Sequence, residues 1–130
     1  MVGAQDRRQF PWPRIKTRLV SPADGAAHHG GTAMATYILL ASYTEQGIKG
    51  IKDTVKRTDA VKDLAKKSGL AMKESYWTLG AYDVVAVFEA PDDETMTGFS
   101  LSIAKLGNVK TQTLRAFSSK EMTGILGKML

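Results

Sequence analysis

The segment Tyr82-Asp-Val-Val-Ala-Val-Phe88 decides the fold, because its last five residues form the most continuously apolar stretch of the chain. A strand with apolar side chains on both faces is typical of the centre of a sheet. The earlier segment Thr36-Tyr-Ile-Leu-Leu-Ala-Ser-Tyr43 has the same two-sided pattern. We therefore expect these two segments to be the central strands of one sheet.

A long helix is predicted between the two central segments. Thr44 is a suitable N-cap and Gly69 a suitable stop, and apolar and charged residues between them occupy opposite faces. The apolar positions are Ile48, Ile51, Val55, Val61, Leu64 and Ala65. A strand is expected from Leu70 to Leu79, and a tight turn at Gly80-Ala81, with a positive φ at Gly80, joins it to the next strand.

The last part of the chain adds a helix, a strand and a terminal helix. Pro91-Asp92-Asp93-Glu94 begins a helix with an acidic first turn, and Gly107-Asn108 ends it. The alternation from Val109 to Phe117 indicates an edge strand. A short terminal helix carries an apolar stripe of Met122, Ile125, Leu126, Met129 and Leu130.

The order β-α-β-β-α-β with a C-terminal helix predicts a ferredoxin-like α+β domain with sheet order 4-1-3-2. Both crossover helices must cover the same face of such a sheet, because parallel crossovers are right-handed. Residues 37–42 and 84–88 place apolar side chains on the other face as well. Either the terminal helix or a second subunit must cover that face, and we expect a dimer in which two sheets pack face to face.

Two segments carry a resemblance to a known family. Residues 76–93 read Tyr-Trp-Thr-Leu-Gly-Ala-Tyr-Asp-Val-Val-Ala-Val-Phe-Glu-Ala-Pro-Asp-Asp, and residues 107–117 read Gly-Asn-Val-Lys-Thr-Gln-Thr-Leu-Arg-Ala-Phe. Over about residues 36–118 the chain resembles the GYD-domain family, whose name-giving residues are represented here by Gly80, Tyr82 and Asp83. The family is similar to the dimeric α+β barrel group, so the resemblance implies that type of fold. It implies no activity, because none is established for the family.

The net charge of +5 is unevenly distributed along the chain. Residues 1–33 hold five basic and two acidic residues and three of the four prolines, without apolar periodicity. We expect a flexible basic tail there and one domain at residues 34–130. A targeting peptide, or a nucleic-acid-binding arm with Phe10 and Trp12 stacking on bases, are two interpretations. We favour a third, an extension from an upstream start codon, because Met34 immediately precedes the first strand.

The composition excludes several kinds of site. The chain has no cysteine, and its two histidines, His28 and His29, are adjacent rather than at the i, i+4 spacing of a helical metal site. We therefore predict no metal site and no cofactor. No apolar run approaches the roughly 20 residues that span a bilayer, and no secretory apolar core is present, so we expect a cytoplasmic protein without a membrane partner.

Four residues are candidates for ligand binding: Trp77, Tyr82, Asp83 and Arg115. Turn chemistry and packing explain the first three without a ligand, since an aspartate after a tight turn bonds backbone N–H groups. The alternative places Asp83 in an aromatic pocket, as a general base or an anchor for a ligand. Arg115 suits bidentate carboxylate binding, or a solvated or ion-paired role. No catalytic residue is assigned, because Asp83 and Glu89 lie about 20 Å apart on one strand, too far for a carboxylate pair.

Three classes of function follow from these observations. We favour an oligomeric small-molecule-binding or regulatory module, because the expected fold leaves a lined space between the helices and the sheet. Its partners would be other copies of itself and a small-molecule ligand. A cofactor-independent enzyme of the monooxygenase or isomerase kind is the alternative, by analogy of fold alone. Nucleic-acid binding through the tail and the lysine-rich first helix is disfavoured, because Glu45, Asp53, Asp59 and Asp63 interrupt the basic residues of that helix.

Overall fold

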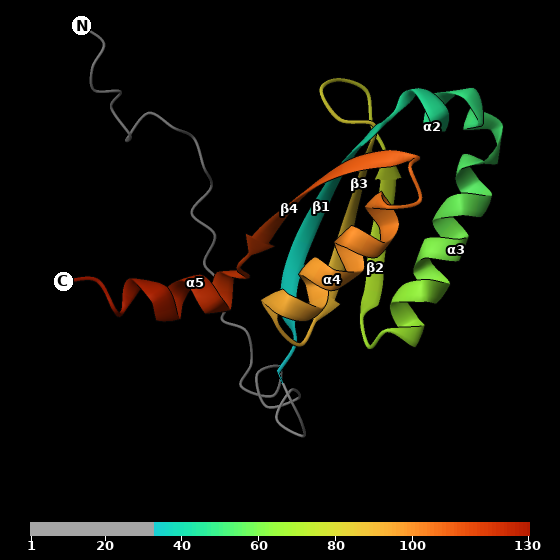
Figure 1. Cartoon of the computed structure of the whole chain (residues 1–130). Coiled ribbons are helices and arrows are strands. Elements are labelled where there is room, and N and C mark those ends of the chain that lie inside the picture. Colours follow the sequence, from blue (N-terminus) through green and yellow to red (C-terminus); the bar gives the residue numbers. More distant parts are fainter. Residues whose placement is uncertain (1–32) are drawn as a thin grey trace, which may run out of the picture.

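The computed structural model of the chain describes residues 33–130 (Figure 1). The predictions made for residues 1–32, including the flexible tail and its three interpretations, lie outside the described residues. The elements are β1 (Ala35–Tyr43), α2 (Glu45–Lys49), η2 (Ile51–Asp53), α3 (Thr54–Lys67), β2 (Ala71–Trp77), β3 (Val84–Ala90), α4 (Asp93–Ala104), β4 (Val109–Ala116) and α5 (Ser119–Leu126). No helix among the described residues has the length and apolar character that crossing a membrane requires.

The four strands form one sheet of order β2-β3-β1-β4, in which every neighbouring pair is antiparallel. The two most apolar segments, β1 and β3, are the central strands, as the sequence predicts. Helices α3 and α4 lie on the same face of the sheet (Figure 1). The ferredoxin-like α+β prediction is therefore confirmed, and β4 is an edge strand as expected.

The core lies between the sheet and the two helices α3 and α4, and its aromatic part packs against α4. Alternate residues of β1 and β3 point toward the helices and are buried, among them Tyr37, Leu39 and Phe88. Phe88 meets Phe99 of α4 edge to face, with ring centroids 5.2 Å apart. Phe88 is completely buried, and truncating such a residue to alanine costs about 3–5 kcal/mol of folding free energy. This packing holds α4 on the sheet.

The opposite face of the sheet carries a strip of apolar side chains, which we call the open face. Its members are Ile38, Leu40, Val85, Val87 and Leu114. Leu114 is 41% exposed, and the other four are half-buried. In the part of the chain that the structure describes, α3 and α4 lie on the other face and α5 projects away from the sheet (Figure 1). The terminal helix, one of the two predicted covers, does not cover this face.

The long first helix of the prediction is interrupted at Gly50, where φ is −101° and ψ is 28°. The prediction of one continuous helix is wrong because the α4–β4 loop holds α2 at an angle to α3. Thr44 donates its backbone N–H to the carbonyl of Asn108 at 3.1 Å and its hydroxyl to the carbonyl of Gly107 at 2.5 Å. A Cβ on Gly47 would lie 2.0 Å from the oxygen of Asn108, so this approach requires glycine.

The connection between β2 and β3 is also longer than the predicted tight turn, because β2 ends at Trp77 and β3 begins at Val84. Thr78 closes the loop by donating its N–H to the carbonyl of Asp83 and its hydroxyl to that of Tyr82. The predicted positive φ at Gly80 is confirmed, at 129°. Two of the predicted ligand-binding residues, Tyr82 and Asp83, therefore lie in this loop and not in a strand.

Candidate functional site

A cavity of about 350 Å³ lies between α3 and the sheet. Small residues create it: Ala41 and Ala86 on the central strands face Ala60 of α3 across the space. The rest of the wall is mostly aliphatic, with Val61 and Leu64 of α3 above the sheet. The volume falls at the small end of ordinary ligand pockets, which measure roughly 300–1,000 Å³. The cavity is therefore suited to a compact apolar molecule.

Polar side chains line one end of the cavity. Thr54, Arg57 and Thr58 lie in the first turns of α3, and Asn108 precedes β4. The other end, near the last turn of α3, is lined by Leu64, Met72 and Phe88, of which the last two face each other across β2 and β3. Ser75, in the middle of β2, is the remaining polar lining residue. The cavity is thus polar at the start of α3 and apolar at its end.

Arg57 is the only charged residue among those that line the cavity. One guanidinium nitrogen, Nη2, donates to the carbonyl oxygen of Gly47 at 3.0 Å. Among the described residues no carboxylate lies within ion-pair distance of Arg57. Sequence reasoning missed this residue because it stands next to Lys56 in a helix rich in exposed lysines. One signal was available in the sequence, because residue 57 is an arginine among lysines. It lies three positions after Thr54 and four before Val61, so the three residues share one face of the helix.

The three predicted hairpin residues make three different contacts. Trp77 is 45% exposed, and its Nε1 donates to Oγ1 of Thr54 at 3.0 Å, so it reaches the polar end of the cavity from outside. Tyr82 donates its hydroxyl to Oε1 of Gln112 in β4 at 2.8 Å. Asp83 accepts the backbone N–H of Tyr43 through Oδ2 at 2.9 Å. Its backbone N–H also donates to the carbonyl of Ala41 at 2.9 Å, and the residue thereby extends the pairing of β3 with β1.

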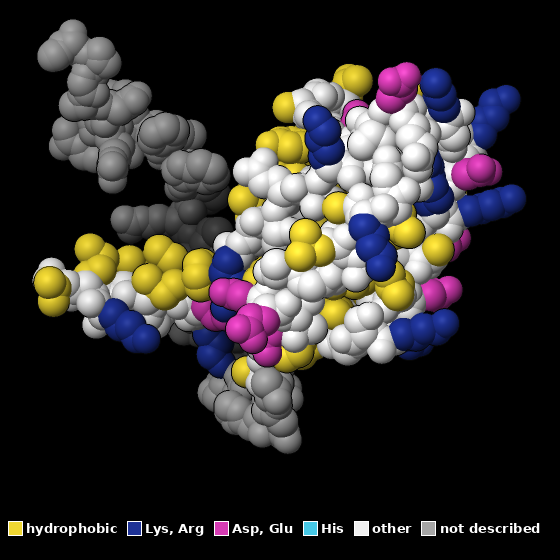
Figure 2. All heavy atoms as spheres, viewed as in Figure 1, with side chains coloured by type: hydrophobic (Ala, Val, Ile, Leu, Met, Phe, Trp, Pro, Cys, Tyr) yellow, Lys and Arg dark blue, Asp and Glu magenta, His cyan; other side chains and the backbone are white. Residues whose placement is uncertain are grey.

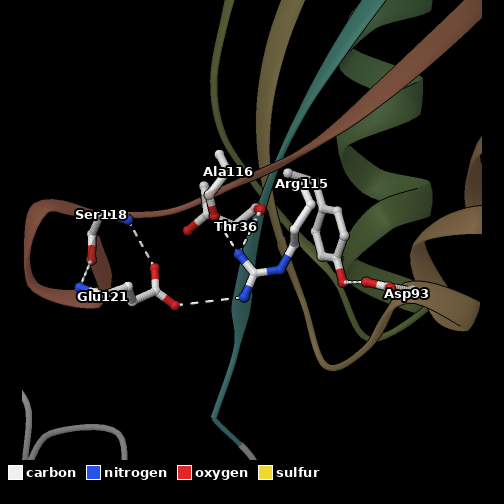
Figure 3. A network of polar contacts seen from close by, with 7 residues as sticks. Thr36, Asp93, Arg115, Ala116, Ser118 and Glu121 are labelled. Carbon is white, nitrogen blue, oxygen red and sulfur yellow. Dashed lines mark hydrogen bonds and ion pairs between the residues drawn. The ribbon is translucent and has the colours of Figure 1, made fainter. Parts of the chain in front are cut away.

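Arg115, the fourth candidate, is engaged at the junction of β4 and α5 (Figure 3). Its Nη2 lies 3.6 Å from Oε2 of Glu121, and its Nη1 donates to the carbonyl of Ala116 and to that of Thr36 at 3.4 Å. The guanidinium also lies over the ring of Phe117, 4.5 Å from its centroid. These contacts fit the ion-paired role considered above, and Arg115 does not line the cavity.

The same region contains a strongly bonded tyrosine. Tyr37 is 3% exposed and donates its hydroxyl to Oδ1 of Asp93, at the start of α4, at 2.5 Å. Burial, and next the hydrogen bond to the Asp93 carboxylate, raise the pKa of Tyr37 to about 12. The phenol thus ties β1 to α4 in its protonated form at neutral pH. It has a structural function at this position.

The start of α5 is capped on both sides. Ser118 accepts the N–H of Glu121 through its hydroxyl at 3.1 Å, and Glu121 accepts the N–H of Ser118 at 2.9 Å. The backbone N–H of Ser118 is the main reason that the pKa of Glu121 lies below its usual value, and Arg115 adds to the effect. Beyond this cap, Met122, Leu126 and Met129 are exposed, and Figure 2 shows apolar side chains gathered along one side of the helix.

Charges are mixed on the outer surface of α3. Figure 2 shows Lys and Arg side chains interspersed with Asp and Glu along this edge of the molecule. Among the described residues there is no group of three His, Asp or Glu side chains that could hold a metal ion. Apart from Arg57, the polar residues of the cavity carry only hydroxyl and amide groups, none of which titrates near neutral pH. This chemistry suits binding better than acid–base catalysis.

Comparison with known proteins adds a family and a fold relative. The model of the GYD domain matches residues 37–126. A protein of Thermus thermophilus named "Glutamine synthetase and cystathionine beta-lyase binding protein" is 36% identical over 84 residues, which are 64% of this chain and 88% of that protein. The crystal structure of MtbAldR superposes with a TM-score of 0.54 over 81% of this chain, at 12% identity, and this chain spans 62% of that structure's length. The last similarity is one of fold alone. The family model and the Thermus relative together show that this chain belongs to the GYD domain family.

Proposed function

We propose that the protein is an oligomeric binding module that holds a compact, largely apolar molecule in the cavity beneath α3. The observation that carries this proposal is the cavity itself, which is walled by aliphatic side chains and has one charged residue at one end. The space of about 350 Å³ is partly open to solvent, and its mainly apolar wall is covered better by an apolar molecule than by water. A cytoplasmic location, predicted from the sequence, is part of this proposal.

The oligomer is proposed to form through the open face. Its centre consists of Ile38, Leu40, Val85 and Val87, while charged residues such as Glu74, Glu89 and Lys110 lie on surrounding positions of the same face. An apolar centre with a polar rim is the usual anatomy of a protein interface. A two-fold dimer needs a surface that is complementary to itself, which a flat apolar sheet face provides.

A regulatory role is proposed by extension from the Thermus relative. The name of that protein describes binding to two enzymes. If this chain has the same kind of partner, occupancy of the cavity beneath α3 provides a means to change that binding, because α3 is the outer wall of the cavity. Of the four residues predicted from the sequence, Trp77 has a part in this proposal, because its bond to Thr54 brings it to the polar end of the cavity.

Filling the cavity tests the small-molecule part of the proposal. Ala86→Leu adds three carbons to a residue that lines the cavity, and Ala104→Leu makes the same change at a residue outside it. We expect small apolar fragments to shift the amide NMR signals of cavity residues in the wild type and in Ala104→Leu, and not in Ala86→Leu. Equal responses in all three proteins would contradict the proposal.

Light scattering tests the oligomer. We expect at least twice the chain mass of 14.1 kDa at micromolar concentration. Leu114→Glu places a charge on the open face at a residue that is 41% exposed, and it is expected to lower the mass to that of one chain. Leu79→Glu, at a fully exposed loop residue, is the matched control and should leave the assembly intact. A wild-type protein of single-chain mass would contradict this part of the proposal.

A further inference from the structure

Arg57 is a cation at the edge of an otherwise uncharged, largely apolar space, and this arrangement restricts what the cavity can bind. A guanidinium has five N–H donors, and the structure shows one of its nitrogens donating to the carbonyl of Gly47. No carboxylate of the described residues pairs with it. A charge next to apolar surface is stabilised when an opposite charge meets it, so the remaining donors favour an anionic group on the ligand.

The position of Arg57 sets the direction of such a ligand. Thr54, Arg57 and Thr58 project from the first turns of α3, and Asn108 adds an amide at the same end. Backbone N–H groups at the start of the 14-residue helix add a partial positive charge on that side. The distant end, lined by Leu64, Met72 and Phe88, offers only apolar contacts.

We infer that the ligand is a compact amphipathic monoanion, a carboxylate on an aliphatic or aromatic body, with its carboxylate on Arg57 and its body toward Phe88. This inference rests on the proposed small-molecule function and adds the chemical class of the ligand. A planar guanidinium matches the two oxygens of a carboxylate. A single cation and a small volume favour one negative charge over a polyanion. The hydroxyl of Thr58, the residue after Arg57, also lines this end of the cavity, where it can donate to the same group.

Three probes with the same chain and different head groups test this inference: octanoate, 1-octanol and octylamine. Each is titrated into the isotope-labelled full chain, and the dissociation constant is taken from amide shifts of cavity residues and from the indole N–H of Trp77. We expect octanoate to bind about 10- to 100-fold more tightly than 1-octanol, which is the range that a charge-assisted hydrogen bond gives. Octylamine is expected to bind more weakly than 1-octanol.

Variants at two neighbouring positions make the test specific. Arg57→Gln should weaken octanoate binding by about 10- to 100-fold and weaken 1-octanol binding far less. Arg57→Lys should recover part of the octanoate affinity. Lys56→Gln, an equal loss of charge at an exposed residue outside the cavity, should change neither affinity. The amide spectrum of each variant reports whether it is folded.

The outcomes separate this inference from the proposed function. If octanoate and 1-octanol bind equally to the cavity, or if Arg57→Gln and Lys56→Gln weaken octanoate to the same extent, the inference is overturned while the binding function stands. If no probe shifts the signals of the cavity residues, both are overturned.

Discussion

Trp77 donates its indole N–H to the hydroxyl of Thr54 at 3.0 Å, and this bond joins the end of β2 to the first turn of α3. The same hydroxyl shares a hydrogen bond of 2.7 Å with the phenol of Tyr43, at the end of β1. Thr54 also lines the cavity. One threonine therefore connects two strands to the helix that forms the outer wall of the proposed binding site.

We predict that Trp77→Phe and Tyr43→Phe each lower the free energy of unfolding by about 0.5–1.5 kcal/mol, the usual contribution of one hydrogen bond. Both bonds involve the hydroxyl of Thr54, so we expect the losses of unfolding free energy in the double variant to differ from the sum of the two single losses. In a Thr54→Val background, Trp77→Phe should change the unfolding free energy very little. Urea unfolding of the single and double variants measures this coupling. Simple additivity of the Trp77 and Thr54 changes would refute the shared role of Thr54.

Two glycines of the helices should respond to alanine in opposite directions. Gly47→Ala places a Cβ 2.0 Å from the carbonyl oxygen of Asn108, so we expect a loss of about 1–3 kcal/mol of stability. Gly98→Ala, in α4, meets nothing within 4 Å and should add up to about 1 kcal/mol, because alanine loses less backbone entropy. Thermal unfolding of both variants measures the difference, and similar melting temperatures would show that α2 is not held against the α4–β4 loop.

The raised pKa of Tyr37 predicts a loss of stability in alkaline solution. The phenol has a pKa of about 12 in the folded chain and near 10 as a free side chain, so its protonated form favours folding. Its contribution is complete below pH 10 and is lost as the pH rises to 12, by at most about 1.4 kcal/mol per pH unit.

Tyr37→Phe isolates this contribution. The difference in unfolding free energy between the wild type and the variant should shrink between pH 10 and pH 12, and it should be constant from pH 7 to pH 9. Urea titrations at fixed ionic strength measure it. A difference that grows with pH would mean that the phenol is stabilised in its charged form.

The capping box of α5 should control the order of that helix alone. Ser118→Ala removes the acceptor for the N–H of Glu121, and N-cap losses of this kind cost about 0.5–2 kcal/mol. We expect faster hydrogen exchange in α5 and unchanged exchange in β1 and β3. Ser119→Ala, one residue further on, is the control. A simultaneous change in the sheet would show that α5 contributes to the stability of the whole domain.

The sequence predicts the sheet because its signals are local and repeated. The two-sided apolar patterns of β1 and β3 identify the central strands. The cap at Thr44 and the acidic segment at residues 91–94 identify helix starts that the structure confirms. The break at Gly50 was missed because its cause is the contact between Gly47 and Asn108, which are 61 positions apart. An amphipathic pattern likewise predicted the terminal helix without indicating where its apolar side would lie.

The identity of the residues that line the cavity was beyond sequence reasoning for a related reason. Ala41, Ala60 and Ala86 are ordinary small residues on three separate elements, and only the tertiary structure shows that they face one space. Arg57 carries no local signal that distinguishes it from the lysines around it. The hairpin residues Trp77, Tyr82 and Asp83 are close in the sequence, but their side chains bond to three different elements. They therefore do not form one site.

A crystal structure of the full chain with octanoate would show whether the space beneath α3 holds a ligand. We expect electron density for the probe between α3 and the sheet, with its carboxylate within hydrogen-bonding distance of Arg57 and its chain against Phe88. This expectation is contradicted if the side chains of Leu64 and Met72 fill the space in the presence of saturating probe, or if the probe lies only on the open face.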